Sequence, residues 1–440
     1  MSIFARRRLQ KMLQSILHYA GSGKTKEIFS RLENKDTKTA LAAEIELALL
    51  WALSEVSTIE VEPLLESGRR PDVFSSDVYE GRNTFIEITA VSDDEFSGSI
   101  VMDRAANIIS EYARQIRKDC AEYLFFTFGE EGGFKNGKYI RRRKITREFQ
   151  LTEPLKEKLR AWLSAGDWPN PPSIRLTDDR IDVVVERKSY VTGRFRTHSS
   201  MPPLAYDIER NPVFKALKRK GEQLSKVSDH SLRWIFLGDA GCNLLRDLNP
   251  IMKSAYGELS GNQIIHHYLS KSRIDMVCVF SATHSNYPTQ QWHKKFWQIT
   301  IFDRRPEFDM QEYEKLERLA RLLPRPHYAA YQARALHKQG VFDPQRRGNY
   351  LGSSFSTRGL GMPLTVKFSA RLLQEFLAGR ITKEQFQRQS FDVDFFENCL
   401  KSGQTIQAAR IESAGIDEDD DYIVLEMNHD WAAKPLELPK

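Results

Sequence analysis

Apolar positions along the chain switch between a helical period and a strand period, which predicts a protein with both α-helices and β-strands. Two helical stretches come first, a basic amphipathic one at residues 5–20 and a strongly apolar one at 37–55. Three short extended runs follow at 58–65, 71–79 and 83–91. A glycine-containing turn signal separates the last two runs, so we expect them to form an antiparallel hairpin.

The same alternation continues to about residue 305. The expected elements are helices at 101–118, 211–228 and 259–270 and strands at 122–128, 173–177, 181–190, 233–239, 274–281 and 295–302. The segment 130–180 is rich in Gly, Pro and Arg, which predicts an insertion. The order helix, three strands, helix, strand indicates an α/β domain in which helices pack against a mixed sheet.

The 440 residues are enough for two or three domains, because a single hydrophobic core rarely serves more than about 250–300 residues. We expect an N-terminal basic helix over residues 1–36, an α/β domain over 37–305 and a C-terminal domain over 306–440. Helical patterns near 366–378 and 382–389 predict that the last domain is mainly helical, with one strand close to its end.

Composition excludes several classes of protein. The chain is 41% hydrophobic and 28% charged, and its apolar runs are all shorter than the roughly 18 residues that a membrane helix needs, so we expect a soluble protein with no membrane partner. The N-terminus lacks the apolar segment of a secretory signal. The four cysteines are isolated in the sequence, which argues against a zinc ribbon or a disulfide framework and favours a reducing cytoplasm.

Charge is distributed unevenly along the chain. The 65 Lys and Arg residues outnumber the 59 Asp and Glu residues, for a net charge of +6. Residues 401–440 hold nine acidic and four basic side chains, a net charge of −5, which leaves +11 on residues 1–400. A basic body with an acidic C-terminal region favours an anionic partner for the body.

The residues most suggestive of catalysis lie in the predicted hairpin. Pro71-Asp72 begins one strand, and Phe85-Ile86-Glu87-Ile88-Thr89 lies within its neighbour. Side chains alternate along strands, so Asp72 and Glu87 can face the same cleft. The run around Glu87 is typical of a strand buried on both faces, where a carboxylate needs a partner or a metal. Two converging carboxylates predict a site for Mg²⁺ (or Mn²⁺), and Glu46 or Glu44 of the preceding helix would orient a metal-bound water.

These residues resemble the PD-(D/E)XK nuclease superfamily, over about residues 38–130 and in an extended match to about 240. The resemblance implies a restriction-endonuclease-like αβββαβ core and Mg²⁺-dependent hydrolysis of DNA phosphodiester bonds. It also implies that Asp72 and Glu87 are metal ligands, with Glu46 (or Glu44) as the third. Nucleases of this kind are common in bacterial restriction, repair and phage-defence systems, so the resemblance implies such a setting for this chain.

The motif departs from the family at one position. The family's lysine, two residues after the glutamate, is Thr89 in this chain, and threonine cannot supply the charge that polarises the attacking water. In this superfamily the lysine is known to move to a neighbouring helix, and Lys220 is the best local candidate, with Gln223 at i+3 on the same helix. Either this helix or the one at 101–118 would take the place of the family's second helix.

Two other segments imitate functional motifs. Glu186-Arg187-Lys188 is a literal E-x-K that follows Asp178, Asp179 and Asp182, but alternating charge on an exposed hairpin explains it better. Gly21-Ser22-Gly23-Lys24-Thr25 resembles the end of a P-loop, yet it follows a predicted helix and lacks the first glycine of that motif. We therefore expect it to be the C-terminal cap of a helix.

Basic clusters in the chain provide candidate contacts to nucleic acid. The candidates in the predicted α/β domain are Arg141, Arg142, Arg143, Lys144, Lys215, Lys218 and Arg219. We expect DNA as the partner, with RNA as an alternative. Two hypotheses follow: a metal-dependent nuclease that includes Lys220 and Gln223 in its catalytic set, or an inactive nuclease fold that binds nucleic acid or serves as an assembly subunit.

The C-terminal region has no motif that assigns a role to it. We expect it to form a homo-oligomer or to bind a partner protein. Its acidic run, Asp417 to Asp421, also suggests an intramolecular mimic of DNA that covers the basic residues of the body.

Overall fold

The computed structural model divides the chain into two compact units, Met1–Phe4 with Leu9–Tyr328, and Ala5–Arg8 with Ala329–Lys440. It describes residues 3–34, 36–92, 99–118, 120–135, 138–146, 148–165, 172–190, 192, 197–198, 208–249, 259–284, 295–305, 310–326, 350–357, 364–390 and 394–430. None of the helices in these residues is long and apolar enough to cross a membrane. The four cysteines all lie in this part of the chain, are buried and form no disulfide.

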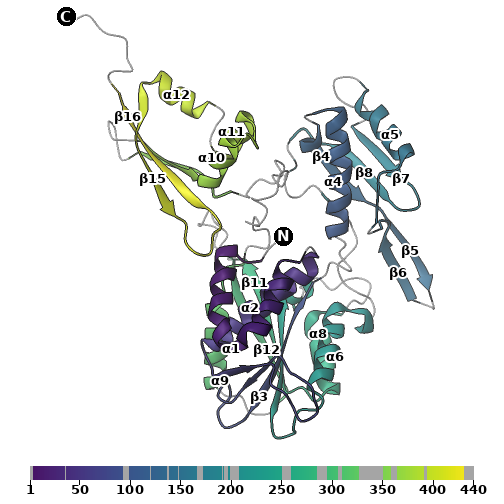
Figure 1. Ribbon diagram of the computed structural model, residues 1–440. Helices are drawn as coiled ribbons and strands as arrows, with labels where there is room; N and C mark the ends of the chain where they lie inside the picture. The colour runs from purple at the N-terminus through teal and green to yellow at the C-terminus, as the bar shows by residue number, and fades with distance from the viewer. Residues whose placement is uncertain are drawn as a thin grey trace, which may run out of the picture. The chain divides into compact units, whose positions relative to one another are not determined.

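The first unit is built around a six-stranded mixed sheet (Figure 1). In spatial order its strands are β1 (Ile59–Val61), β2 (Val73–Ser75), β3 (Thr84–Val91), β10 (Leu232–Asp239), β11 (Met276–His284) and β12 (Lys295–Asp303). The pairs β1–β2, β2–β3 and β11–β12 are antiparallel, and β3–β10 and β10–β11 are parallel. The expected α/β architecture with a mixed sheet is confirmed.

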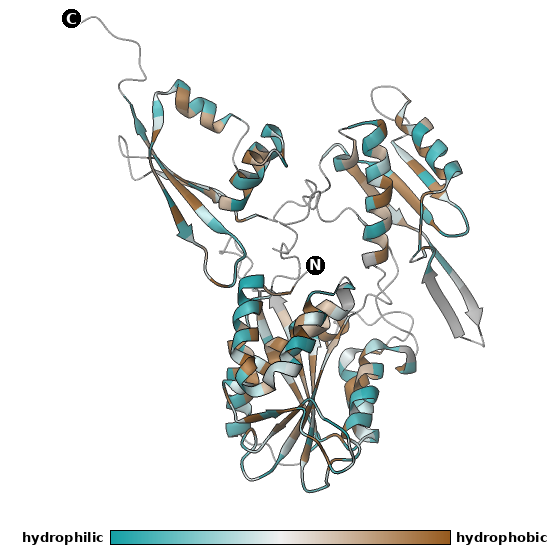
Figure 2. Cartoon of the chain, viewed as in Figure 1, coloured by the Kyte–Doolittle hydropathy of each residue, from teal (hydrophilic) through white to brown (hydrophobic). Residues whose placement is uncertain are grey.

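Helices cover both faces of this sheet. One face packs against α1 (Arg6–Leu32), α2 (Thr37–Ser54) and α9 (Met310–Leu322), and the other packs against α6 (Pro212–Leu224) and α8 (Gly261–Lys271). Strand β10 shows why both faces need cover, because its residues are buried throughout and alternate between the two cores. Figure 2 shows the hydrophobic residues concentrated on the strands and on the helix sides next to them.

Helix α1 contains a break at Gly21. This residue has φ 68° and ψ 172°, so the chain forms one helical segment before it and a second after it. Positive φ costs glycine little, which explains why the first segment ends here. The predicted helix at 5–20 and its glycine cap are thus confirmed, while the second segment, to Leu32, extends the helix beyond the prediction.

The insertion has a sheet and a core of its own. Its four strands, in spatial order, are β7 (Ser173–Thr177), β8 (Asp182–Arg187), β4 (Leu124–Phe128) and β9 (Thr197–His198). They share a hydrophobic core with α4 (Ser99–Ile116) and α5 (Glu153–Leu163). A two-stranded ribbon of β5 (Glu130–Lys135) and β6 (Lys138–Arg143) follows β4. The insertion is therefore wider than the predicted 130–180, since α4 and β4 belong to it.

The second unit contains a four-stranded antiparallel sheet, and the prediction of a mainly helical C-terminal domain is wrong. In spatial order the strands are β13 (Ser354–Thr357), β14 (Leu364–Ser369), β16 (Asp421–His429) and β15 (Gln404–Ser413). The helices are short: α10 (Ala370–Leu377), α11 (Lys383–Ser390) and α12 (Phe395–Lys401). Val366 and Phe368 are buried on one face of β14 with Lys367 between them, which is strand alternation where the sequence indicated a helix. Helix α9 belongs to the first unit, so the second begins later than the predicted residue 306.

The acidic run lies in the second unit and binds the arginines that belong to the same unit. Asp421 accepts two hydrogen bonds from the Arg7 guanidinium, at 2.9 and 2.8 Å. Arg8 donates to Asp417 at 2.7 Å, and the backbone N–H groups of Arg6 and Arg7 donate to Asp419 at 2.8 and 3.0 Å. These contacts place the acidic run in an ion-pair cluster with Arg7 and Arg8.

A candidate active site at a buried carboxylate pair

Asp72 and Glu87 come from neighbouring antiparallel strands of the first unit. Asp72 directly precedes β2, and Val73 is paired with Ile86 of β3. Ile86 and Ile88 point into the core beneath α2, so Glu87 between them points to the opposite face of the sheet, which α6 covers. The Ile88 N–H donates to Asp72 Oδ2 at 2.7 Å, which holds this carboxylate beside the strand that carries Glu87.

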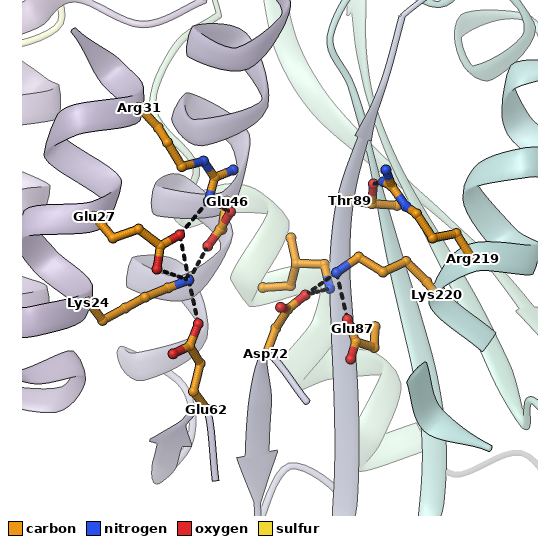
Figure 3. A network of polar contacts seen from close by, with 11 residues as sticks. Lys24, Glu27, Arg31, Glu46, Glu62, Asp72, Glu87, Thr89, Arg219 and Lys220 are labelled. Carbon is orange, nitrogen blue, oxygen red and sulfur yellow. Dashed lines mark hydrogen bonds and ion pairs between the residues drawn. The ribbon is translucent and has the colours of Figure 1, made fainter. Parts of the chain in front are cut away.

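Lys220 joins the two carboxylates. Its Nζ lies 2.7 Å from Asp72 Oδ2 and 2.6 Å from Glu87 Oε2 (Figure 3). Glu87 is 0% exposed and Lys220 is 8% exposed, so their contact is shielded from solvent, whereas Asp72 is half-buried. The sequence prediction that Lys220 lies near this pair is confirmed by these distances.

The sequence of α6 explains how Lys220 reaches the sheet. The Asn211 side chain caps the helix by accepting the Val213 N–H at 2.8 Å, with Pro212 at the first turn. The buried residues recur at helical spacing, and Lys220 stands among them: Val213, Ala216, Leu217, Lys220 and Leu224. Next to it, a Cβ on Gly221 would lie 1.8 Å from the Tyr268 hydroxyl, so the glycine lets α8 pack closely against α6. The packed helix holds the lysine in place.

Burial and mutual repulsion shift the titration of this cluster. Burial and the negative charge of Asp72 together raise the pKa of Glu87 from its ordinary 4.5 to about 8, against the opposing effect of Lys220. Burial acts to lower the pKa of Lys220, but the charges of Asp72 and Glu87 outweigh it and raise that pKa. Both Glu87 and Lys220 therefore hold their protons more tightly than usual, because a single ammonium group is shared between two carboxyl groups.

One oxygen of the pair has no hydrogen-bond partner among the described residues. Glu87 Oε1 is buried and accepts no hydrogen bond from the residues that the structure describes. Such an atom costs free energy unless a donor or a cation satisfies it. Two carboxylates with a buried, unsatisfied oxygen fit a hard divalent cation, which takes oxygen ligands and keeps several waters. Asp72 and Glu87 would supply the protein ligands. The described residues contain no group of three or more His, Cys, Asp or Glu that could hold a metal, so this site would offer two acidic ligands.

The two glutamates of α2 lie elsewhere. Glu44 is buried and accepts the backbone N–H groups of Ile3 and Phe4 at 2.7 and 3.0 Å, so it anchors the N-terminus. Glu46 forms ion pairs with Lys24 and Arg31 of α1, at 3.1 and 2.7 Å. Helix α2 packs against the face of the sheet opposite α6, and the contacts above join its glutamates to the N-terminus and to α1. The predicted third ligand, Glu46 or Glu44, is therefore not part of this cluster.

A second charged cluster was missed by sequence reasoning. Lys24 is bound by Glu62 at 2.6 Å as well as by Glu46, and Glu27 lies 3.4 Å away (Figure 3). Glu62 has φ 53°, a left-handed conformation that is uncommon for glutamate. Its N–H donates to the Asp72 carbonyl at 3.0 Å, so the two clusters are neighbours through the backbone. Lys24 belongs to the segment that imitates a P-loop. In the structure its ammonium group binds Glu46 and Glu62.

Thr89, at the position where the resemblance implies a lysine, has a cation beside it. Thr89 lies two residues after Glu87 on the same strand, and Arg219 donates to its hydroxyl at 3.0 Å. Lys215 and Lys218, on the same helix as Arg219, are exposed. Gln223, one turn after Lys220 on the same helix, is also exposed, whereas Lys220 is buried.

The alternative E-x-K segment has partners of its own. The Arg175 guanidinium donates two hydrogen bonds of 2.7 Å to Asp182, and Lys188 pairs with Glu186 at 2.6 Å. Asp178 accepts the N–H groups of Arg180 and Ile181 in the turn between β7 and β8. These are the contacts of a charged hairpin, as the sequence favoured.

The basic residues of β6 lie on the ribbon. The strand register places Arg141, Arg142 and Arg143 opposite Gly132, Glu131 and Glu130, and Lys144 follows the strand. Burial lowers the pKa of Arg143, with Glu130 opposing the shift. The ribbon contains more basic than acidic side chains, so it keeps a positive net charge.

Comparison of the chain with models of known protein families, with curated proteins and with solved structures found no match.

Proposed function

We propose that this chain is a metal-dependent nuclease that hydrolyses DNA phosphodiester bonds with Asp72, Glu87 and Lys220. The observation that carries the proposal is the position of Lys220 Nζ, 2.7 Å from Asp72 and 2.6 Å from Glu87 on a buried face of the sheet. Two acids and a lysine on adjacent elements are the group that the resemblance to PD-(D/E)XK nucleases implies. The lysine comes from α6, since the strand carries Thr89 at the usual position.

The chain order of the central elements supports a restriction-endonuclease-like core. Helix α2 is followed by the three antiparallel strands β1, β2 and β3, and α6 then leads into β10, parallel to β3. This order corresponds to the αβββαβ pattern that the resemblance implies. Helix α6 would correspond to the second helix of that pattern, since α4 packs in the separate core of the insertion.

Mg²⁺ or Mn²⁺ bound to Asp72 and Glu87 would supply Lewis-acid chemistry to the reaction. The residues of the chain have separate tasks. Lys220 would stabilise the negative charge that develops on the phosphate, since its ammonium is held rigidly by packing and by both acids. Burial of Glu87 keeps water away from its carboxylate and strengthens its interactions with cations. Burial raises the pKa of Glu87, so binding of a metal ion at this carboxyl group would release a proton.

Basic residues next to the cluster would bind the nucleic-acid backbone. Lys215 and Lys218 are exposed on α6, and Arg219 lies beside Thr89 at 3.0 Å. Phosphate contacts from Lys and Arg give affinity without sequence preference. The ribbon with Arg141, Arg142, Arg143 and Lys144 would add contacts from the insertion. DNA is the proposed substrate, and RNA is the alternative that the same contacts would serve.

A second candidate function is a nuclease fold that binds nucleic acid without cutting it, or serves as an assembly subunit. The observation that favours it is the absence of a third acidic ligand in the described residues. Lys220 also forms ion pairs with both Asp72 and Glu87, so its positive charge compensates part of their negative charge without a metal. The two functions share the binding residues and differ in whether a phosphodiester bond is broken.

Cleavage of plasmid and single-stranded DNA in Mg²⁺ or Mn²⁺ distinguishes the two functions. We expect the wild-type chain to cut, and Asp72→Asn and Glu87→Gln to lose cleavage while they retain DNA binding. Glu186→Gln is the matched control, because it removes the glutamate of the alternative motif on β8. Retained binding without cleavage in any metal would favour the second function, and loss of cleavage in Glu186→Gln would assign the activity to the insertion.

A further inference from the structure

Strand β15 of the second unit is an exposed edge strand. It pairs with β16 on one side and is the last strand of its sheet. Its ten residues form the longest strand of that sheet, and most of them are exposed. Natural edge strands are protected by short length, charged side chains, proline or bulges. Strand β15 has a bulge and two charged side chains, Arg410 and Glu412, but it is ten residues long and contains neither proline nor lysine.

Two exposed isoleucines on this strand share one face of the sheet. Ile406 is 55% exposed and Ile411 is 74% exposed. They are five positions apart, which would place them on opposite faces of a regular strand. A bulge between Ile406 and Ala408 corrects this, because Ile406 is paired with Met427 and Ile411 with Ile423, four positions apart on β16.

The isoleucines continue the apolar face of the sheet to its open edge. Met427 belongs to the hydrophobic core of the second unit, and Ile423 packs against it. The opposite face of the sheet is polar, where Arg410 pairs with Glu426 and Lys367 pairs with Glu412. Among the described residues, Ile406 and Ile411 remain exposed on this face at the β15 edge, as Phe355 does on β13 at the other edge.

The sequence of β15 is complementary to itself in the antiparallel direction. The bulge leaves Gln407 outside the ladder, so a two-fold axis through Ala409 pairs the other nine residues of β15 on matching faces and places Ile406 opposite Ile411 of a second strand. The same register sets Arg410 opposite Ala408 and Glu412 opposite Thr405, so no like charges meet.

We propose that a second copy of this chain pairs with β15, antiparallel and about a two-fold axis through Ala409, to form a dimer. The pairing satisfies the open N–H and C=O groups of both edges and covers Ile406 of each copy with Ile411 of the other. The result is one continuous eight-stranded sheet across the dimer. This proposal is independent of the proposed nuclease function.

Analytical ultracentrifugation of the full chain in the micromolar range tests the pairing. The wild-type chain should sediment as a dimer, and Ile406→Lys/Ile411→Lys as a monomer. Both isoleucines are exposed, so the second unit should fold unchanged in this variant. Phe355→Lys/Leu377→Lys is the matched control, since it adds the same charge at exposed apolar residues of the same unit and should remain a dimer.

Engineered cysteines test the register. In Ile406→Cys/Ile411→Cys, mild oxidation should link two chains covalently, whereas each single variant should not cross-link. The native cysteines are buried and do not compete, and the two new thiols are too far apart along one strand to bond to each other. A monomeric wild type would overturn the proposal. A dimer that persists in Ile406→Lys/Ile411→Lys, or that dissociates in the control variant, would also overturn it. The same holds if Ile406→Cys/Ile411→Cys does not cross-link.

Discussion

Lys220 Nζ lies 2.6 Å from Glu87 Oε2, although 133 positions separate the two residues in the sequence. The contact exists because β10 returns parallel to β3 and brings α6 across the face on which Glu87 lies. The same nitrogen is 2.7 Å from Asp72, so one cation is shared between two acids. This arrangement leaves Glu87 Oε1 buried and unsatisfied among the described residues, and it underlies the predictions that follow.

Stability should depend on pH through Glu87. Its pKa is raised from 4.5 to about 8 by burial and by Asp72, so the folded chain holds this proton more tightly than the unfolded chain. The contribution of Glu87 to the free energy of unfolding is therefore greatest below pH 4.5 and falls as the pH rises toward 8. We expect the wild type to lose on the order of 2–4 kcal/mol over this window relative to Glu87→Gln, which cannot titrate.

Urea unfolding of both proteins at several pH values measures this difference. The raised pKa of Lys220 contributes a constant stabilisation over the window, because that group stays charged throughout it. Parallel curves for the wild type and Glu87→Gln would show that the pKa of Glu87 is not raised in the folded protein.

Glu44 should stabilise the fold without taking part in catalysis. It accepts two backbone N–H groups, from Ile3 and Phe4, whose side chains are fully buried. Glu44→Ala removes a charged acceptor and should lower the free energy of unfolding by about 2–3 kcal/mol. Glu44→Gln keeps an acceptor and should cost less. The folded fraction of Glu44→Ala should cut DNA at the wild-type rate, and a loss of cleavage beyond its loss of folded protein would disagree with the structure.

Glu46 should not be a metal ligand. Its carboxylate is engaged by Lys24 and Arg31 on α1. Glu46→Gln should therefore leave the affinity for Mn²⁺ unchanged, as measured by isothermal titration calorimetry, while Asp72→Asn weakens it. We expect Glu46→Gln to destabilise the chain by about 1–2 kcal/mol, since it leaves two partly buried cations with less compensation. Weaker Mn²⁺ binding in Glu46→Gln would restore this residue to the metal site.

Much of the central fold could be predicted from periodicity, because its strands are short apolar runs between turns. The C-terminal sheet could not. Strand β15 is exposed on both faces, so burial imposes no alternation on its sequence. The run Thr365–Phe368 does alternate, but helical spacing in the residues that follow extended the predicted helix backwards over it. Edge strands and strand-to-helix junctions carry weak sequence signals for this reason.

The candidate site could be predicted in part. Asp72 and Glu87 were identifiable because a carboxylate within an apolar strand needs a partner. The choice between α4 and α6 required the tertiary structure, since both are amphipathic helices before a strand. The roles of Glu44 and Glu46 also required it. Helix α2 is buried on most of its surface, so its sequence does not show which side faces α1. The partners of Lys24 lie on two other elements, and no local pattern points to them.

A lysine at position 89 should replace the function of Lys220. Thr89 lies on the same strand as Glu87, two residues later, where the family has its lysine. Lys220→Met should cut DNA about 100-fold more slowly, as expected when one group that stabilises the transition state is removed. Lys220→Met/Thr89→Lys should recover at least about tenfold of that loss by the same reasoning. The control is Lys220→Met/Glu222→Lys, which adds positive charge at an exposed position of α6. If this variant regained as much cleavage as Lys220→Met/Thr89→Lys, net charge and not the position of the lysine would explain the recovery.

The rate of Mg²⁺-dependent DNA cleavage by Lys220→Met, compared with Lys188→Met, tests the central claim most directly. Lys188 is the lysine of the alternative motif and pairs with Glu186 on the insertion. The account predicts that the wild type and Lys188→Met cut at the same rate, and that Lys220→Met is slower by about 100-fold with unchanged affinity for DNA. Equal cleavage by Lys220→Met and the wild type, or no metal-dependent cleavage by the wild type, would contradict it.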